Sequence, residues 1–190
     1  MCSIFGVLTS KGSDHPDDII KYHIDRLFLL SESRGKEAAG IAVNTGEAIH
    51  VLKQPVSAFR FIKTPEYSDL LQEQLSLKVP LAAIGHCRLV TSNNQDSDKS
   101  NQPIVKKGAV GVHDGIVVNA AELAGHYPDI LSECKTDTEL LLGLLQYHRE
   151  ERNSIISAAQ ETFSEIHGAA SVGVLFDSND VLLLATNTGS

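Results

Sequence analysis

Short runs of β-forming residues recur along the chain, and several of them are apolar on both faces. The runs occupy residues 3–8, 38–43, 48–52, 81–87, 109–113, 170–176 and 181–185. Strands that are apolar on both faces belong to sheets that other elements cover. Several neighbouring runs have no helical segment between them, which favours antiparallel pairing over a regular βαβ repeat. The sequence therefore predicts α/β layering with substantial antiparallel pairing.

Helical segments separate these groups of strands. Apolar residues follow helical spacing most clearly over 17–30, and Pro16 suits the first turn there. Further helices are predicted over 65–76, 120–126, 137–148 and 154–166. Residues able to cap a helix stand at their starts: Thr64 before Pro65, Asn119 with Glu122, Thr136 with Glu139, and Asn153.

Length and composition suit one globular domain over residues 1–190. A chain of this size buries about 70% of the surface that it exposes when unfolded, so it needs no metal or disulfide to hold its core. The polar stretch at 92–103 is rich in turn formers, and we interpret it as a long loop inside that domain.

The charge pattern argues against nucleic-acid and membrane partners. The net charge is -8, and the basic residues are scattered along the chain. Lys11, Asp14, Asp17 and Asp18 stand where a secretory signal needs an apolar run, and no segment approaches the roughly 18 apolar residues of a membrane span. We therefore expect a cytoplasmic protein that binds neither nucleic acid nor membranes.

The cysteines and histidines do not indicate a metal site. Cys2, Cys87 and Cys134 are an odd number at long spacings, which predicts thiols rather than disulfides or a zinc motif. The histidines at 15, 23, 50, 126, 148 and 167 show no metal-ligand spacing. The sequence thus predicts no metal ion and no cofactor.

Cys2 follows the initiator methionine directly, which gives it a chemical option that the other cysteines lack. Removal of Met1 would leave one residue with both a thiol and an α-amine. The amine has an ordinary pKa of about 7.7–8.0, so near neutral pH it can accept the thiol proton and later protonate a leaving amine. Taken alone, Cys2 is also compatible with a small buried side chain.

Other short segments stand in a specific order after Cys2. They are MCSIFGV, SRGKEAAGIAV, GHCRLVTS, NQP, HDGIVVN and TDTEL. This set resembles the class II, or N-terminal-nucleophile, glutamine amidotransferases, and it corresponds to the glutaminase domain of enzymes such as glucosamine-6-phosphate synthase and amidophosphoribosyltransferase. The resemblance implies a four-layer αββα sandwich of the N-terminal-nucleophile hydrolase type. It also implies that Cys2 attacks the side-chain amide of glutamine, releases ammonia and leaves a thioester for water to hydrolyse.

The resemblance implies that Arg88, Thr91 and Asp137 bind the amino-acid end of glutamine. The Arg88 guanidinium would hold the α-carboxylate with the Thr91 hydroxyl nearby, and Asp137 would hold the α-ammonium. Simpler interpretations stay open for two of them. Arg88 also suits an edge-strand ion pair, and Asp137 suits an ordinary acidic first turn of a helix.

Arg34, Gly35 and His86 are expected to support the site. Gly35 permits unusual dihedrals in a turn where Arg34 can brace the loop of the nucleophile, although Arg34 also suits a surface helix end. Alternation along residues 81–87 sends His86 and Arg88 to one face and Cys87 to the other. The alternation therefore argues against a metal pair of His86 with Cys87.

The segment HDGIVVN is expected to form the oxyanion hole. Gly115 would let its backbone N–H approach the tetrahedral intermediate, and Asn119 would cap the following helix. The family usually has Asn before that glycine, whereas this chain has Asp114. An ionised carboxylate cannot donate a hydrogen bond, so the rate of glutamine hydrolysis is in question.

Three alternative functions are compatible with these residues. The first is a glutamine-hydrolysing domain whose ammonia acceptor is handled by a partner protein or by a further domain of a longer enzyme. The second is a catalytically impaired module that binds glutamine or regulates, which Asp114 makes credible. The third is another amide hydrolase with an N-terminal nucleophile, such as an acylase, against which Arg88 and Asp137 argue because they suit an amino-acid head group.

Overall fold

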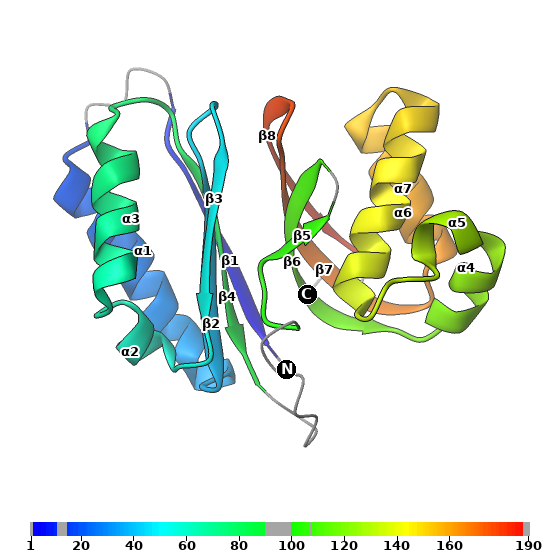
Figure 1. Ribbon diagram of the computed structural model, residues 1–190, viewed down its shortest axis with the longest axis horizontal. Helices are drawn as coiled ribbons and strands as arrows, with labels where there is room; N and C mark the ends of the chain where they lie inside the picture. The colour runs from blue at the N-terminus through cyan, green and yellow to red at the C-terminus, as the bar shows by residue number, and fades with distance from the viewer. Residues whose placement is uncertain (1, 11–14, 90–99, 107, 188–190) are drawn as a thin grey trace. The chain divides into compact units, whose positions relative to one another are not determined.

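The computed structural model describes residues 2–10, 15–89, 100–106 and 108–187. The chain divides into two compact units, Met1–Pro103 and Ile104–Ser190. Each unit contains one four-stranded antiparallel sheet with helices (Figure 1). This confirms the predicted α/β class with antiparallel pairing. The prediction of one domain over the whole chain, with four layers, stays a prediction.

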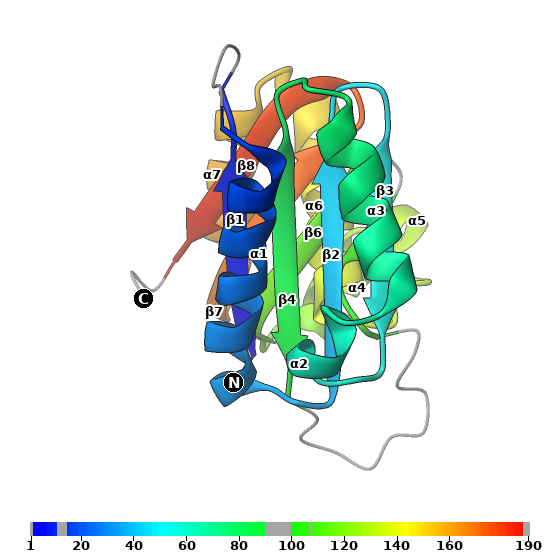
Figure 2. The ribbon, with the colours of Figure 1, turned by 90° about the vertical axis from the view of Figure 1, so that its left-hand side faces the viewer.

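The sheet of the first unit has the strand order β1-β4-β2-β3. Its strands are β1 (Ser3–Leu8), β2 (Ala38–Asn44), β3 (Ile49–Gln54) and β4 (Ala82–Arg88). The helices of this unit are α1 (Asp17–Ser31), the 3-10 turn η1 (Glu32–Arg34), α2 (Ala58–Phe61) and α3 (Pro65–Ser76). Figure 2 shows α1 and α3 side by side over one face of the sheet. That face is referred to below as the helix face.

Aromatic side chains fill the space between these helices and the sheet. Phe28, Phe61 and Tyr67 are fully buried, with ring centroids 5.2–5.9 Å apart. The Tyr67 hydroxyl donates a hydrogen bond of 2.6 Å to the Asp25 carboxylate on α1. Burial, followed by the bond to Asp25, raises the pKa of Tyr67 above its ordinary value. The buried hydroxyl is therefore satisfied, and it ties α3 to α1.

The sheet of the second unit has the strand order β5-β6-β7-β8. Its strands are β5 (Ile104–Lys106), β6 (Ala109–Val117), β7 (Gly168–Phe176) and β8 (Asn179–Thr186). Its helices are α4 (Ala120–His126), α5 (Pro128–Leu131), α6 (Asp137–Arg152) and α7 (Ile155–Glu165). The leucines of α6 and the alanines of α7 pack with the apolar side chains of the strands in one core. The unit therefore repeats the arrangement of a sheet with helices packed on it.

Most helices begin where the sequence predicts, but two asparagines do not have the capping roles predicted for them. Thr136 and Glu139 form the predicted capping box at the start of α6. Asn119 occupies the cap position of α4, but the prediction that its side chain caps the helix is wrong. Its amide instead donates to the carbonyl of Glu165 and accepts from the N–H of His167, two backbone groups at the end of α7. Asn153 does not cap α7 either, because it ends α6 in the left-handed conformation and Ser154 caps α7.

No helix among the described residues is long and apolar enough to cross a membrane.

A cap substitution in the first unit tests how α3 is stabilised. Thr64 is the N-cap of α3, and its hydroxyl accepts from the N–H of Tyr67. Thr64→Ala should lower the free energy of unfolding by about 1 kcal/mol, measured by urea denaturation. Ser57, at the N-cap of α2, makes no side-chain cap bond and provides a matched control. Equal losses for Thr64→Ala and Ser57→Ala would show that the cap bond of α3 does not contribute.

Candidate functional site

The end of β1 places Cys2 on the face of the first sheet opposite the helices. Ser3 pairs with Cys87 of β4, and the Ser3 hydroxyl donates 3.1 Å to the Ser31 hydroxyl of α1. Ser3 therefore points to the helix face, and the next residue back points the other way. Continuing the same register sets Cys2 beside Arg88, and its side chain is half-buried.

Strand β4 separates a buried thiol from the polar residues. Cys87 is fully buried on the helix face, with Sγ 3.9 Å from the carbonyl oxygen of Phe28. Burial, then the charges of Glu32 and Cys2, raise the pKa of Cys87 to about 12. His86 and Arg88 alternate with Cys87 and so belong to the opposite face, as predicted. Cys87 is thereby a packing residue and His86 cannot share a metal with it.

Two residues of the 100–103 segment hold the Arg88 guanidinium. Its Nη1 donates to the Ser100 hydroxyl at 2.7 Å and to the Asn101 side-chain oxygen at 2.8 Å. The Lys53 ammonium on β3 donates to the carbonyls of Asn101 and Pro103, at 2.7 and 3.2 Å. The segment is thus fixed to the edge of the sheet, and the guanidinium is fixed to the segment. Sequence reasoning noted the NQP motif without assigning it this role.

Gly35 is required by its approach to the end of β4. A Cβ atom on Gly35 would lie 2.4 Å from the Arg88 carbonyl carbon and 2.6 Å from its oxygen. Its backbone is extended, so space and not dihedral strain selects glycine here. Arg34 is an exposed residue at the end of η1. The idea that Arg34 braces the loop of the nucleophile stays a prediction, and Thr91 lies outside the described residues.

In the second unit, β6 continues through the predicted oxyanion segment. Gly115 has φ +147°, and a Cβ atom there would lie 1.9 Å from the Ala169 carbonyl oxygen on β7. Both the dihedral and the contact allow only glycine. The sequence predicted a strand that ends at residue 113, whereas β6 pairs with β7 as far as Val117. The exposed backbone of Gly115 is therefore held by a rigid sheet and not by a loop.

His113 lies beside Gly115, and the sequence analysis assigned it no role. It is buried, and its Nε2 lies 2.9 Å from where a Gly115 Cβ would stand. Burial lowers the pKa of His113 below its ordinary value, and the charges of Asp137 and Asp114 oppose that shift. Its position directly before Asp114 and Gly115, in the segment HDGIVVN, was the available signal.

Asp137 begins α6 and is tied to β6. Its Oδ2 accepts the N–H of Val117 at 2.9 Å, and Thr136 caps the helix beside it. The helix-start interpretation of Asp137 is thus confirmed, with the added tie to the strand. Its contact with the substrate ammonium stays a prediction. Within the first unit, β1 and β4 bring Cys2 and Arg88 together, and within the second unit Asp137 and Asp114 both act on His113.

Known proteins share this sequence pattern. A family profile described as a glutamine amidotransferase domain matches residues 86–189. The glutamine–fructose-6-phosphate aminotransferase (isomerizing) of Staphylococcus aureus is 28% identical over 190 residues, covering 98% of this chain and 29% of the relative. The Staphylococcus epidermidis enzyme of the same name is 27% identical with the same coverage. The chain spans less than a third of the length of these relatives.

Solved structures share the fold. A glutamine phosphoribosylpyrophosphate amidotransferase from B. subtilis, complexed with ADP and GMP, matches with a TM-score of 0.67 and 23% identity, covering 97% of this chain and 37% of that one. A structure described as the allosteric regulatory enzyme of purine biosynthesis has a TM-score of 0.67 and 25% identity, over 92% of this chain and 35% of that one. These neighbours confirm the fold class as that of the N-terminal-nucleophile hydrolases.

The burial of Cys87 predicts which thiols react. Near neutral pH, iodoacetamide should leave Cys87 unmodified in the folded protein, because its side chain is fully buried and its pKa is about 12. Peptide mapping by mass spectrometry before and after unfolding in urea measures this, with half-buried Cys134 as the internal comparison. Alkylation of Cys87 in folded protein at the rate seen in urea would contradict its assignment to the helix face.

Proposed function

Because the chain belongs to the class II glutamine amidotransferases, we propose that it hydrolyses the side-chain amide of glutamine with Cys2 as the nucleophile. Members of this family hydrolyse glutamine and transfer the ammonia. The observation that carries the proposal is the pairing of Ser3 with Cys87, because continuing that register sets Cys2 beside Arg88 on the face of β4 opposite the helices. That position pairs a half-buried thiol with a cation suited to a free amino acid.

The proposed reaction uses the α-amine of Cys2 as its base. After removal of Met1, the amine takes the thiol proton, and the thiolate attacks the amide carbon of glutamine to form a tetrahedral intermediate. The protonated amine then gives its proton to the leaving nitrogen, and ammonia departs as the thioester forms. Water, deprotonated by the same amine, hydrolyses the thioester to glutamate and restores the thiol.

Arg88, Thr91 and Asp137 are assigned to the head group of glutamine. The bonds of Arg88 to Ser100 and Asn101 orient its planar guanidinium, which suits two-point binding of a carboxylate. Asp137 contributes a negative charge for the α-ammonium, while its Oδ2 accepts from Val117. A cation and an anion together select the zwitterionic end of an amino acid, which disfavours an acylase.

Gly115 is assigned to the oxyanion hole, with Asp114 next to it. The positive φ and exposed backbone of Gly115 support an N–H that can face a developing negative charge. Asp114 supplies a carboxylate where the family usually has an amide donor. That observation supports a second candidate function, a module that binds glutamine with impaired hydrolysis.

The ammonia acceptor is assigned to a synthase partner protein or to a further domain. The relatives named above extend well beyond the region that this chain matches. L-glutamine is the proposed substrate and the cytoplasm the proposed location, with neither nucleic acid nor membrane as a partner.

The amine-base mechanism predicts that Met1 is absent from active protein and that Cys2→Ala abolishes ammonia release. Cys134→Ala should retain activity, because Cys134 has no α-amine beside its thiol. Intact-mass spectrometry after incubation with a glutamine-derived diazoketone electrophile reports Met1 removal and Cys2 labelling together. Active enzyme that retains Met1 would exclude the α-amine as the base.

Substitution of Asp114 by asparagine is predicted to increase glutamine hydrolysis. Asp114→Asn restores an amide donor, and it should raise the kcat of glutamine hydrolysis by up to about 100- to 1,000-fold with little change in glutamine affinity. Glutamate release measures the rate, and calorimetry with the Cys2→Ala background measures the affinity. Should both forms bind glutamine and neither release glutamate, the binding-module function is the better one.

A further inference from the structure

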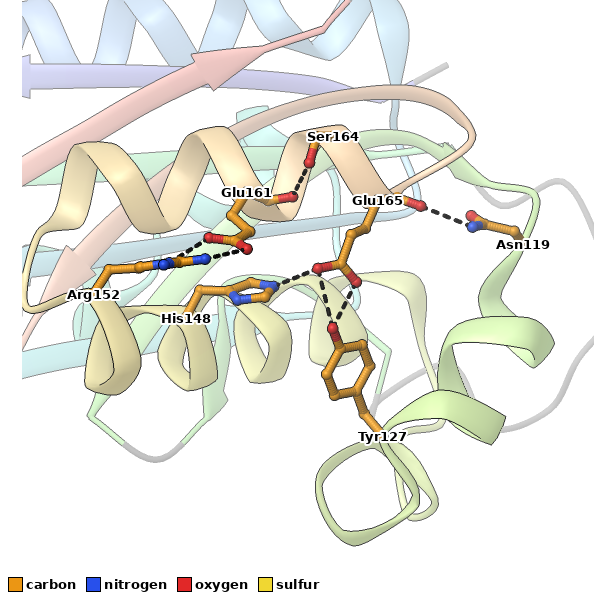
Figure 3. Close-up of polar contacts among 7 residues, drawn as sticks. All are labelled: Asn119, Tyr127, His148, Arg152, Glu161, Ser164 and Glu165. Atoms are coloured by element: carbon orange, nitrogen blue, oxygen red, sulfur yellow. Dashed lines mark hydrogen bonds and ion pairs between the residues drawn. The ribbon is translucent and has the colours of Figure 1, made fainter.

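A cluster of potential metal ligands lies in the second unit, between α6 and α7. Glu161 and Glu165 are four residues apart on α7, so their carboxylates share one face of that helix. His148 on α6 points toward them (Figure 3). One ligand atom from each of the three residues lies within 4.8 Å of the others. None of these residues is assigned to glutamine chemistry.

His148 brings a buried ring nitrogen into this cluster. Its side chain is only 5% exposed, and Nε2 lies 2.9 Å from a carboxylate oxygen of Glu165. The distance is that of a hydrogen bond or an ion pair, but Nε2 makes no hydrogen bond of acceptable geometry among the described residues. A buried nitrogen aimed at two carboxylates without a well-directed bond is an arrangement that a cation can satisfy.

We propose that His148, Glu161 and Glu165 form a binding site for a divalent transition-metal ion, with zinc as the best match. Imidazole nitrogen and carboxylate oxygen are ligands that zinc takes at about 2.0–2.2 Å. Tetrahedral ligands at that distance are about 3.3–3.6 Å apart, so side-chain rotation suffices to bring these atoms into place. The two carboxylates also supply the negative charge that a divalent ion requires.

Tyr127 and Asn119 position Glu165 for this role. The Tyr127 hydroxyl donates to both oxygens of Glu165, at 2.9 and 3.1 Å. Asn119 binds the Glu165 carbonyl and so holds the end of α7 (Figure 3). Hydrogen bonds of this kind to a ligating carboxylate orient it in metal sites.

Arg152 competes with the metal for Glu161. Its guanidinium makes bonds of 2.6 and 2.7 Å to the two oxygens of Glu161. The Arg152 side chain is 54% exposed, and exposed ion pairs are weak, so a metal ion can displace it. Arg152 therefore sets the affinity of the site.

The sequence predicts no metal site because it contains no pair of ligands at a characteristic spacing around His148. The ligands come from two helices, and only the packing of α6 on α7 brings them together. The proposed zinc site therefore differs from the sequence-based prediction of no metal, because helix packing and not sequence spacing creates it.

Zinc titration of the untagged full chain tests the site. Isothermal calorimetry should find one zinc ion per chain, and zinc should raise the thermal unfolding temperature. Tyr127→Phe removes the hydrogen bonds that orient Glu165 and should weaken binding by about 10- to 100-fold. Glu161→Gln and His148→Gln remove ligands and should weaken it further. Arg152→Gln should tighten binding, because it removes the competitor of the metal. Glu150→Gln, an exposed change of the same charge on α6, should leave binding unchanged.

Cobalt substitution separates this site from the cysteines. Cobalt bound by His148 and the two glutamates should show no thiolate-to-metal absorption band. A thiolate band, unchanged affinity in Glu161→Gln, or failure of both wild type and Arg152→Gln to take up zinc would each overturn the proposal. Glu161 is partly exposed, so its substitution tests the site even if His148→Gln fails to fold.

Discussion

Strand β4 lies between β1 and β2, and its alternating side chains place Cys87 on one face and His86 and Arg88 on the other. Cys87 packs among the aromatic residues of the helix face, while His86 and Arg88 belong to the other face. A shift of register by one residue would exchange the two sets and place Arg88 in the core. The burial of the aromatic cluster fixes that register. The position of Cys2 depends on it as well, because Ser3 pairs with Cys87.

Close backbone contacts fix the positions of the strand ends that carry the proposed site residues. Gly35 lies against the carbonyl of Arg88, and Gly115 lies against the carbonyl of Ala169. At each position a Cβ atom would force two segments apart, so the main chain itself is held closely. The remaining freedom is removed by polar side chains: Lys53 fixes the segment that carries Asn101, and Asp137 fixes the end of β6. The side chains proposed to bind the substrate, Arg88 and Asp137, are thus held in place on a strand and a helix.

Sequence predicts the parts of this fold that depend on local patterns. Runs of apolar residues predicted the seven longer strands, and the Thr136 and Glu139 pair predicted the start of α6 correctly. Both signals are local in the chain. Strand β5 and helices α2 and α5 are only three or four residues long, too short for periodicity to appear. The C-terminal end of β6 and the role of Asn119 were missed because partners distant in sequence decide them. Asn153 was misassigned locally, because it ends α6 and Ser154 caps α7. The same applies to Arg88, whose partners Ser100 and Asn101 had no visible connection to it.

Binding and chemistry are separable in a site of this kind, and that separation bears on Asp114. Arg88 and Asp137 would contact charged groups that glutamine carries before and after reaction, so they contribute equally to the ground state and the transition state. A donor at the oxyanion acts only as negative charge develops, so its loss lowers the rate and leaves affinity unchanged. Asp114 therefore does not argue against glutamine as the ligand, whichever rate it permits. Burial lowers the pKa of His113 although the charges of Asp137 and Asp114 oppose that shift, so the imidazole beside Gly115 is neutral at pH 7. If Gly115 forms the oxyanion hole as proposed, a carboxylate at position 114 opposes the developing negative charge, and residue 114 is then the position that decides the rate.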